Sequence, residues 1–293
     1  MFCVNLCEYF PPNHWAGNSL ERFLKSLSAQ RSGEPVSRIY IGSSFCGKYF
    51  LHFSGFEHIF DWCGHSGIPV TICTPVFTEM DRQKGQDRLA MLCQSGKGVV
   101  DEITVNDYGM LSFLRSTSHR LNLGRLFFKD PRDARVPDYV QQRVTPAFSS
   151  CLVDGFLKEY PISSIELDPV SEEMDLTPLK KVGFQVGLHT PFCYMTTGNI
   201  CKFASIHRPI QWKFRPSLDC AMECLSIAES YSGHIKPTNC DPVLLRMGRT
   251  LYFERNAVSF HKEQPDRIIY FPAREWRGFV EGGELDENTG SFE

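Results

Sequence analysis

Short β-forming runs alternate with helical patterns along most of the chain. Four apolar residues between Leu20 and Leu27 recur at helical spacing, and Asn18 with Glu21 forms a capping signature in front of them. Further helices are predicted over residues 81–94 and 108–115. Strands are predicted at residues 4–9, 38–42, 68–73, 99–105, 121–128, 163–167, 182–188, 249–254 and 267–271. This alternation is typical of βαβ units in a mainly parallel sheet.

The number and order of these elements predict an α/β fold of the (β/α)8 TIM-like barrel type. Seven β segments precede residue 190 and two follow it, which suits an imperfect barrel. An open, doubly wound sheet is the alternative, but no G-x-G-x-x-G motif follows a predicted strand. We predict one barrel domain over residues 1–280, with a cysteine-rich segment after the seventh strand, and an acidic, flexible tail over residues 281–293.

Composition narrows the class of protein. The 293 residues are 42% hydrophobic and 22% charged, with a formal net charge of −3, which excludes a largely disordered chain. The bulk charge does not indicate nucleic-acid or membrane binding, although it leaves local basic patches open. No apolar run is long enough to span a membrane, and the N-terminus lacks the pattern of a signal peptide. These features predict a soluble, cytoplasmic protein.

Twelve cysteines are many for a chain of this kind. In a reducing compartment, clustered thiols are more typical of metal binding or redox chemistry than of a disulfide framework. Five of them lie in one part of the sequence, namely Cys193, Cys201, Cys220, Cys224 and Cys240. On a helix, Cys220 and Cys224 would project from one face. Soft thiolate ligands favour an iron–sulfur cluster, with a zinc site or unligated thiols as the alternatives.

Cys46 is a further candidate from an earlier part of the chain. It follows the strand predicted at residues 38–42, in the run Gly42-Ser-Ser-Phe-Cys46-Gly-Lys48. In a barrel the loops that follow the strands open at the same carboxyl face, so Cys46 can meet the later cysteines. The alternative interpretation is that Cys46 is a partly buried loop cysteine that binds no metal.

The order and placement of these motifs resemble the collagenase-like peptidase family U-32, over residues 2–275. The resemblance rests on residues 39–42, on Val105-Asn-Asp107-Tyr-Gly109, and on His189-x3-Cys193-x4-Gly198-x2-Cys201 followed by Cys220-x3-Cys224. Within the family, the setting of Cys46 is most similar to a branch that acts in ubiquinone biosynthesis. The resemblance implies a four-iron four-sulfur (4Fe-4S) cluster and, with a related partner subunit, oxygen-independent hydroxylation of an aromatic quinone precursor.

The resemblance also implies a ligand set. The pattern of the ubiquinone branch assigns Cys46, Cys201, Cys220 and Cys224. The pattern of its sister subunit assigns instead Cys193, Cys201, Cys220 and Cys240. We favour the first set because Cys46 has little other reason for its position.

Three residues are candidates for acid–base chemistry. Glu166 and Asp107 lie where barrel enzymes place such groups, at the ends of predicted strands, and His189 ends the seventh strand beside the cysteine segment. A structural histidine is the alternative for His189.

A basic run follows the strand predicted at residues 121–128. Arg125, Lys129 and Arg132 could hold a carboxylate or phosphate by charge-assisted hydrogen bonds. A solvated loop with internal acidic partners is the alternative.

These observations lead to a leading functional hypothesis and three others. The first is an iron–sulfur subunit that forms a heterodimer with a related family member and hydroxylates an aromatic or prenylated small molecule. A peptidase is the second, although no activated nucleophile is evident. Hydroxylation of an RNA base is the third, which the negative net charge opposes. A structural zinc protein is the fourth.

Overall fold

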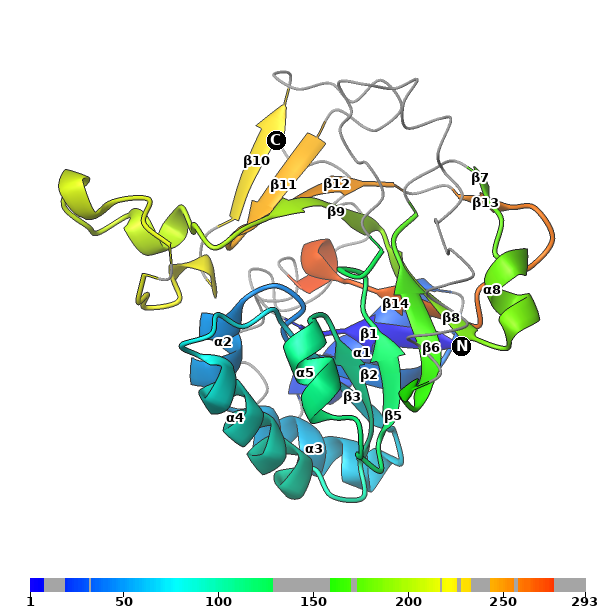
Figure 1. The fold of residues 1–293 in the computed structure, drawn as a ribbon. Coiled ribbons are helices and arrows are strands. Elements are labelled where there is room, and N and C mark those ends of the chain that lie inside the picture. The colour runs from blue at the N-terminus through cyan, green and yellow to red at the C-terminus, as the bar shows by residue number, and fades with distance from the viewer. Residues whose placement is uncertain are drawn as a thin grey trace.

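Eight parallel strands close into a barrel, with helices along its outer side (Figure 1). The structure is a computed structural model that describes residues 1–7, 19–31, 33–128, 159–169, 173–216, 218–225, 228–232, 243–255 and 258–276. Around the barrel the strands follow the order β1 (Phe2–Asn5), β14 (Arg267–Tyr270), β8 (Gln185–Thr190), β6 (Ile162–Leu167), β5 (Arg120–Leu123), β4 (Val100–Val105), β3 (Val70–Thr74) and β2 (Val36–Gly42). The predicted (β/α)8-type barrel is confirmed.

The helices form where apolar residues recur at helical spacing. Helix α1 (Ser19–Gln30) buries Leu20, Phe23, Leu24 and Leu27, the stripe that the sequence predicts. The other described helices are α2 (Gly47–His52), α3 (Phe56–Ser66), α4 (Arg82–Ser95), α5 (Tyr108–Phe113) and α8 (Thr177–Val182). In the described part of the chain, no helix has the length and apolar character needed to cross a membrane.

A second, antiparallel sheet lies next to the barrel. Its order is β10 (Ala228–Ser232), β11 (Val243–Met247), β12 (Thr250–Glu254) and β9 (Phe192–Thr197). The strand predicted at residues 249–254 therefore joins this sheet rather than the barrel, and β14 is the eighth barrel strand. The reason is that β9 begins directly after β8 and pairs with β12 along its whole length. A short parallel pair, β7 (Glu173–Met174) with β13 (Ser259–Phe260), completes the described strands.

An aromatic layer joins the carboxyl end of the barrel to the second sheet. Phe45, which follows β2, packs on Tyr194 of β9 at 5.3 Å and on Tyr252 of β12 at 5.8 Å between ring centroids. Phe192 and Phe271 meet edge to face at 5.8 Å. These side chains are all buried. Burial of large aromatic surfaces fixes the second sheet over this end of the barrel.

The opposite, amino-terminal half of the barrel interior holds a charge network. The fully buried Glu102 of β4 accepts hydrogen bonds from Arg267 of β14 at 2.7 and 3.2 Å, from Thr71 of β3 at 3.1 Å and from Asn122 of β5 at 3.2 Å. Arg38 of β2 lies 3.3 Å from the same carboxylate. Burial alone would raise the pKa of Glu102, but Arg267 and Arg38 lower it to about 2. The network links five strands through one carboxylate.

Candidate metal centre

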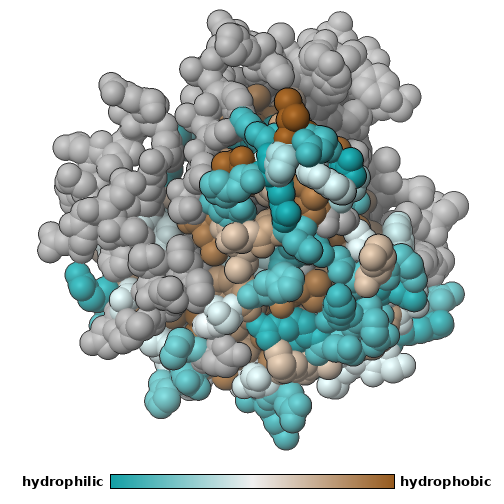
Figure 2. Space-filling view, turned by 90° about the vertical axis from the view of Figure 1, so that its left-hand side faces the viewer, coloured by the Kyte–Doolittle hydropathy of each residue, from teal (hydrophilic) through white to brown (hydrophobic). Residues whose placement is uncertain are grey.

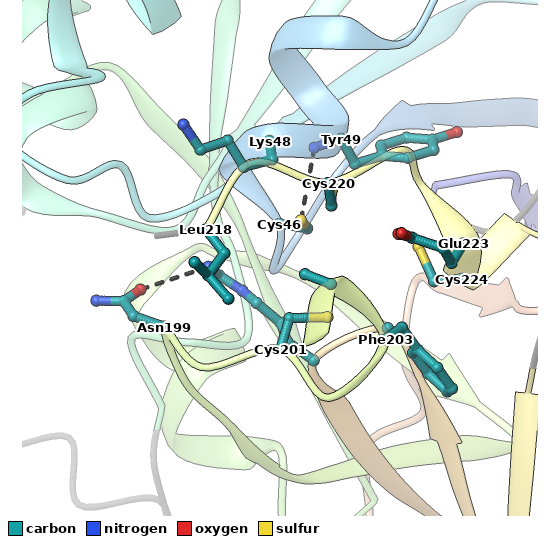
Figure 3. Close-up of a pocket in the computed structure, with 13 residues that line it drawn as sticks. Cys46, Lys48, Tyr49, Asn199, Cys201, Phe203, Leu218, Cys220, Glu223 and Cys224 are labelled. Atoms are coloured by element: carbon teal, nitrogen blue, oxygen red, sulfur yellow. Dashed lines mark hydrogen bonds between the residues drawn. The ribbon is translucent and has the colours of Figure 1, made fainter. Parts of the chain in front are cut away.

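Cys46, Cys201, Cys220 and Cys224 line one pocket at the rim of the barrel (Figure 3). Its empty volume is about 560 Å³, including open solvent at its mouth. Helix α2 forms one wall, the segment between β9 and β10 forms another, and the turn between β11 and β12 contributes Arg249. The preferred ligand set from the sequence thus lies around a single cavity.

Cys46 is positioned by a tight turn after β2. Gly42 has a φ of 97°, and a Cβ atom there would lie 2.4 Å from the carbonyl oxygen of Cys73, so only glycine fits. Ser43 Oγ then accepts the backbone N–H of Cys46 at 2.7 Å. Cys46 caps the start of α2, and its sulfur accepts the backbone N–H of Tyr49 at 3.5 Å. These contacts hold the thiol at the pocket wall, half-buried.

The other three thiols come from the segment between β9 and β10. Ser205 Oγ donates to the carbonyl of Cys201 at 3.1 Å, which fixes the turn behind this residue. Burial raises the pKa of the Cys220 thiol. The expected helical pairing of Cys220 and Cys224 is wrong: Met222 has a φ of 58°, and only a short 3-10 turn, η5 (Glu223–Leu225), follows. The two thiols nevertheless face the same pocket.

Two cations border the pocket. Lys48 Nζ lies 3.4 Å from Asp81 and 3.4 Å from Asp219, the neighbour of Cys220. Burial opposes the charge of Lys48, but the two carboxylates raise its pKa, so the ammonium group stays protonated. Arg249 donates to the side-chain oxygen of Asn199 at 3.4 Å. Burial outweighs the charge of Lys48, which lowers the pKa of the Cys220 thiol, so the net pKa of this thiol is raised.

The spacing of the donors bears on the kind of metal group that they could hold. Among the described residues, no three His, Cys, Asp or Glu side chains converge closely enough to hold one metal ion. A tetrahedral zinc site requires its sulfur atoms about 2.3 Å from a common point. A 4Fe-4S cluster binds its four thiolates through different iron atoms, so its ligands do not share one metal ion. The four thiols that line this pocket match the ligand number of such a cluster, and the kind of metal group stays a prediction.

Cys193, the alternative ligand, lies elsewhere. It belongs to β9, is fully buried against Leu244, Leu251 and Phe253, and donates its S–H to the carbonyl of Pro169 at 3.4 Å. It does not line the pocket. Cys240 lies outside the described residues.

Glu166 and His189 meet inside the barrel. Thr104 donates to one carboxylate oxygen of Glu166 at 2.6 Å, and His189 Nε2 lies 3.0 Å from the other. Burial and the charge of Arg125 lower the pKa of His189, so its ring is neutral and donates its Nε2–H to Glu166. The structure brings these two candidates together, but neither lines the pocket.

Asp107 has a structural partner. It caps helix α5, and its Oδ1 accepts the backbone N–H of Met110 at 2.9 Å. Burial raises its pKa. Its proposed acid–base role stays a prediction.

Arg125 lies in the interior rather than on a solvated loop. Its guanidinium donates to Asp168 at 2.9 Å and to the carbonyl of Phe192 at 3.3 Å, and it stands 4.8 Å from the centre of the Phe45 ring. The flat cation fits between the aromatic rings, where it pairs with a buried carboxylate. Its role in binding an external anion stays a prediction. Lys129 and Arg132 lie outside the described residues.

Lys48, Glu223 and Arg249 also line the pocket and were not predicted from the sequence. Lys48 follows Cys46 by two positions, which is a usable signal once Cys46 is chosen. Arg249 reaches the pocket only through the turn between β11 and β12, and that pairing is not visible in the sequence.

Two comparisons with known proteins were negative. The chain matches no protein-family model, and no curated protein is significantly similar to it. The family resemblance therefore stays a prediction, and the function must be argued from the site.

Proposed function

We propose that the chain holds a 4Fe-4S cluster through Cys46, Cys201, Cys220 and Cys224. The observation that supports this proposal is that four thiols from two distant parts of the sequence line one pocket. Other described cysteines, such as Cys193, are fully buried in the hydrophobic core, where free cysteine ordinarily lies. The four pocket cysteines are only partly buried, and Cys46 also packs against the edge of the core. Core packing does not account for the position of Cys201, Cys220 and Cys224 around the same pocket.

The residues around the thiols suit such a group. The backbone N–H of Tyr49 donates to the Cys46 sulfur, and hydrogen bonds of this kind tune the reduction potential of iron–sulfur centres. Lys48 and Arg249 line the same pocket, and Lys48 is itself paired with Asp81 and Asp219. The buried ring of Phe203 lines the pocket and excludes water from that wall. When bound, a 4Fe-4S cluster supplies one-electron transfer or a Lewis-acidic iron.

For the activity, the resemblance to the ubiquinone branch supports oxygen-independent hydroxylation of an aromatic quinone precursor, together with a related partner subunit. The pocket opens to solvent, which leaves a route for a small molecule or a partner. No contact among the described residues specifically favours the peptidase, the RNA-base hydroxylase or the structural zinc protein.

The ligand proposal is tested by metal analysis of the anaerobically purified chain. We expect about four iron and four sulfide per chain. Cys46→Ala should lose most of the iron, whereas the matched variant Cys193→Ala should retain it. Loss of iron only in Cys193→Ala would assign the sister-subunit set instead. One zinc without sulfide in the wild-type chain would refute the cluster.

The activity is tested separately. The loaded chain, alone and with a related family member, is incubated without oxygen with an aromatic quinone precursor, and the hydroxylated product is measured by mass spectrometry. We expect product from the pair but not from the pair that contains Cys46→Ala. A chain that binds the cluster but forms no product would refute the hydroxylase activity without affecting the proposed metal centre.

A further inference from the structure

The segment between β9 and β10 projects from the second sheet (Figure 1). It exposes apolar side chains. Ile210 is 86% exposed, Trp212 48% and Phe214 56%. We call these three residues the apolar tip. On the side of the molecule to which the segment projects, hydrophobic side chains stand among hydrophilic ones (Figure 2). None of the three lines the pocket.

The part of this segment that carries the apolar tip is basic, whereas the two acidic residues of the segment, Asp219 and Glu223, follow it. Residues 199–218 include Lys202, Arg208, Lys213 and Arg215 but no Asp or Glu. The chain as a whole has a net charge of −3, so the positive charge is local. Lys202, Arg208 and Arg215 are exposed beside the apolar tip.

Local contacts hold the apolar tip outward. Phe214 has a φ of 55°, a left-handed backbone that is unfavourable for a bulky residue, and its N–H donates to Ser205 Oγ at 2.9 Å. Arg215 stands 4.2 Å over the Trp212 ring, and Arg208 donates to the carbonyl of Asp219 at 2.8 Å. The exposure is therefore built by specific contacts.

We propose that the apolar tip and its cations dock on the surface of an anionic lipid bilayer. Trp and Phe prefer the interface between headgroups and acyl chains, and Lys and Arg are attracted to anionic headgroups. A projecting, convex tip suits a deformable surface, whereas a protein partner would need a matching groove. Nucleic acid would contact the cations, but its phosphate backbone would not bury the apolar side chain of Ile210. This proposal does not depend on the cluster.

The test is flotation of the full chain with phosphatidylcholine vesicles that contain about 30% phosphatidylserine. We expect binding that falls at least about tenfold in Ile210→Ser/Trp212→Ser/Phe214→Ser. The matched control Val76→Ser/Met80→Ser, at apolar residues that are 39% and 89% exposed, should bind as wild type does. Binding to phosphatidylcholine alone should be several-fold weaker.

A second measurement does not require the triple variant to fold. Vesicles with brominated acyl chains should quench the fluorescence of Trp212, and Trp212→Phe should lose that quenching but keep its binding. No flotation of the wild-type chain, or no quenching specific to Trp212, would overturn the proposal. So would a dimer in sedimentation velocity that the triple variant dissociates, because the surface would then belong to a second copy.

Discussion

Glu102→Gln tests how far the barrel depends on its buried charge network. Glutamine has nearly the same shape but removes the negative charge that faces Arg267, Arg38 and the half-exposed Arg120. The guanidinium groups of Arg267 and Arg38 are buried, so water cannot replace the carboxylate that they lose. Removing one member of a buried ion pair typically costs about 3–5 kcal/mol.

The pKa of Glu102 gives a separate value for the contribution of its charge to stability. The difference between the ordinary value of 4.5 and about 2 in the folded protein corresponds to about 3 kcal/mol of folding free energy at pH 7. Because the folded-state pKa is depressed, this stabilisation is complete above pH 4.5 and is lost as the pH falls towards 2. At pH 3.5 about 2 kcal/mol should remain.

The assay is urea unfolding followed by circular dichroism at pH 7 and pH 3.5. Glu102→Gln should lower the free energy of unfolding by about 3 kcal/mol at pH 7 and by about 1 kcal/mol less at pH 3.5. Asp101→Asn is the matched control, because Asp101 also pairs with Arg38 but its side chain is 42% exposed. Its cost should stay below about 1 kcal/mol. Equal costs for the two variants, or a Glu102→Gln effect that grows at low pH, would refute the reasoning.

Two further predictions concern stability, with the same assay. Gly42→Ala should lower the free energy of unfolding by about 2–4 kcal/mol, because the new Cβ meets a carbonyl oxygen. Gly33→Ala, with φ of 81° and open space around it, should lower it by about 1 kcal/mol. Equal losses would contradict the argument from the close approach. Arg125→Met should cost about 3–5 kcal/mol, and Arg125→Met/Asp168→Leu should recover part of the loss because it also removes the buried carboxylate. A double variant less stable than Arg125→Met would show that the unpaired carboxylate of Asp168 does not cause the loss of stability.

The barrel could be predicted because each of its strands has a local signature. Parallel strands buried on both faces appear as short β-forming runs between helical patterns, and their order along the chain fixes where the loops open. That same rule predicted that Cys46 would meet Cys201 and Cys220, although the residues are far apart in sequence. The structure places these thiols around one pocket.

The second sheet could not be predicted in the same way. Strand β9 lies within the cysteine motif, and its partner β12 is more than fifty residues later, so neither has a local turn signal that pairs it with the other. The helical expectation for Cys220 and Cys224 failed because residue spacing does not reveal the left-handed backbone at Met222. The network around Glu102 could not be predicted from the sequence either, because Arg267 follows Glu102 by 165 residues.

The position of the pocket separates two groups of candidates that the sequence treats as one site. Barrel enzymes usually build their sites over the barrel axis at the carboxyl end. Here Phe45 and Arg125 pack under the second sheet and are buried, and Glu166 and His189 lie buried within the barrel. The open cavity lies instead at the rim, beside α2. Lys48 lines this cavity, whereas Glu166 does not. Phe45 directly precedes Cys46 in the chain and packs on the guanidinium of Arg125, whose charge adds to burial in lowering the pKa of His189, so the aromatic layer lies between the two groups of candidates.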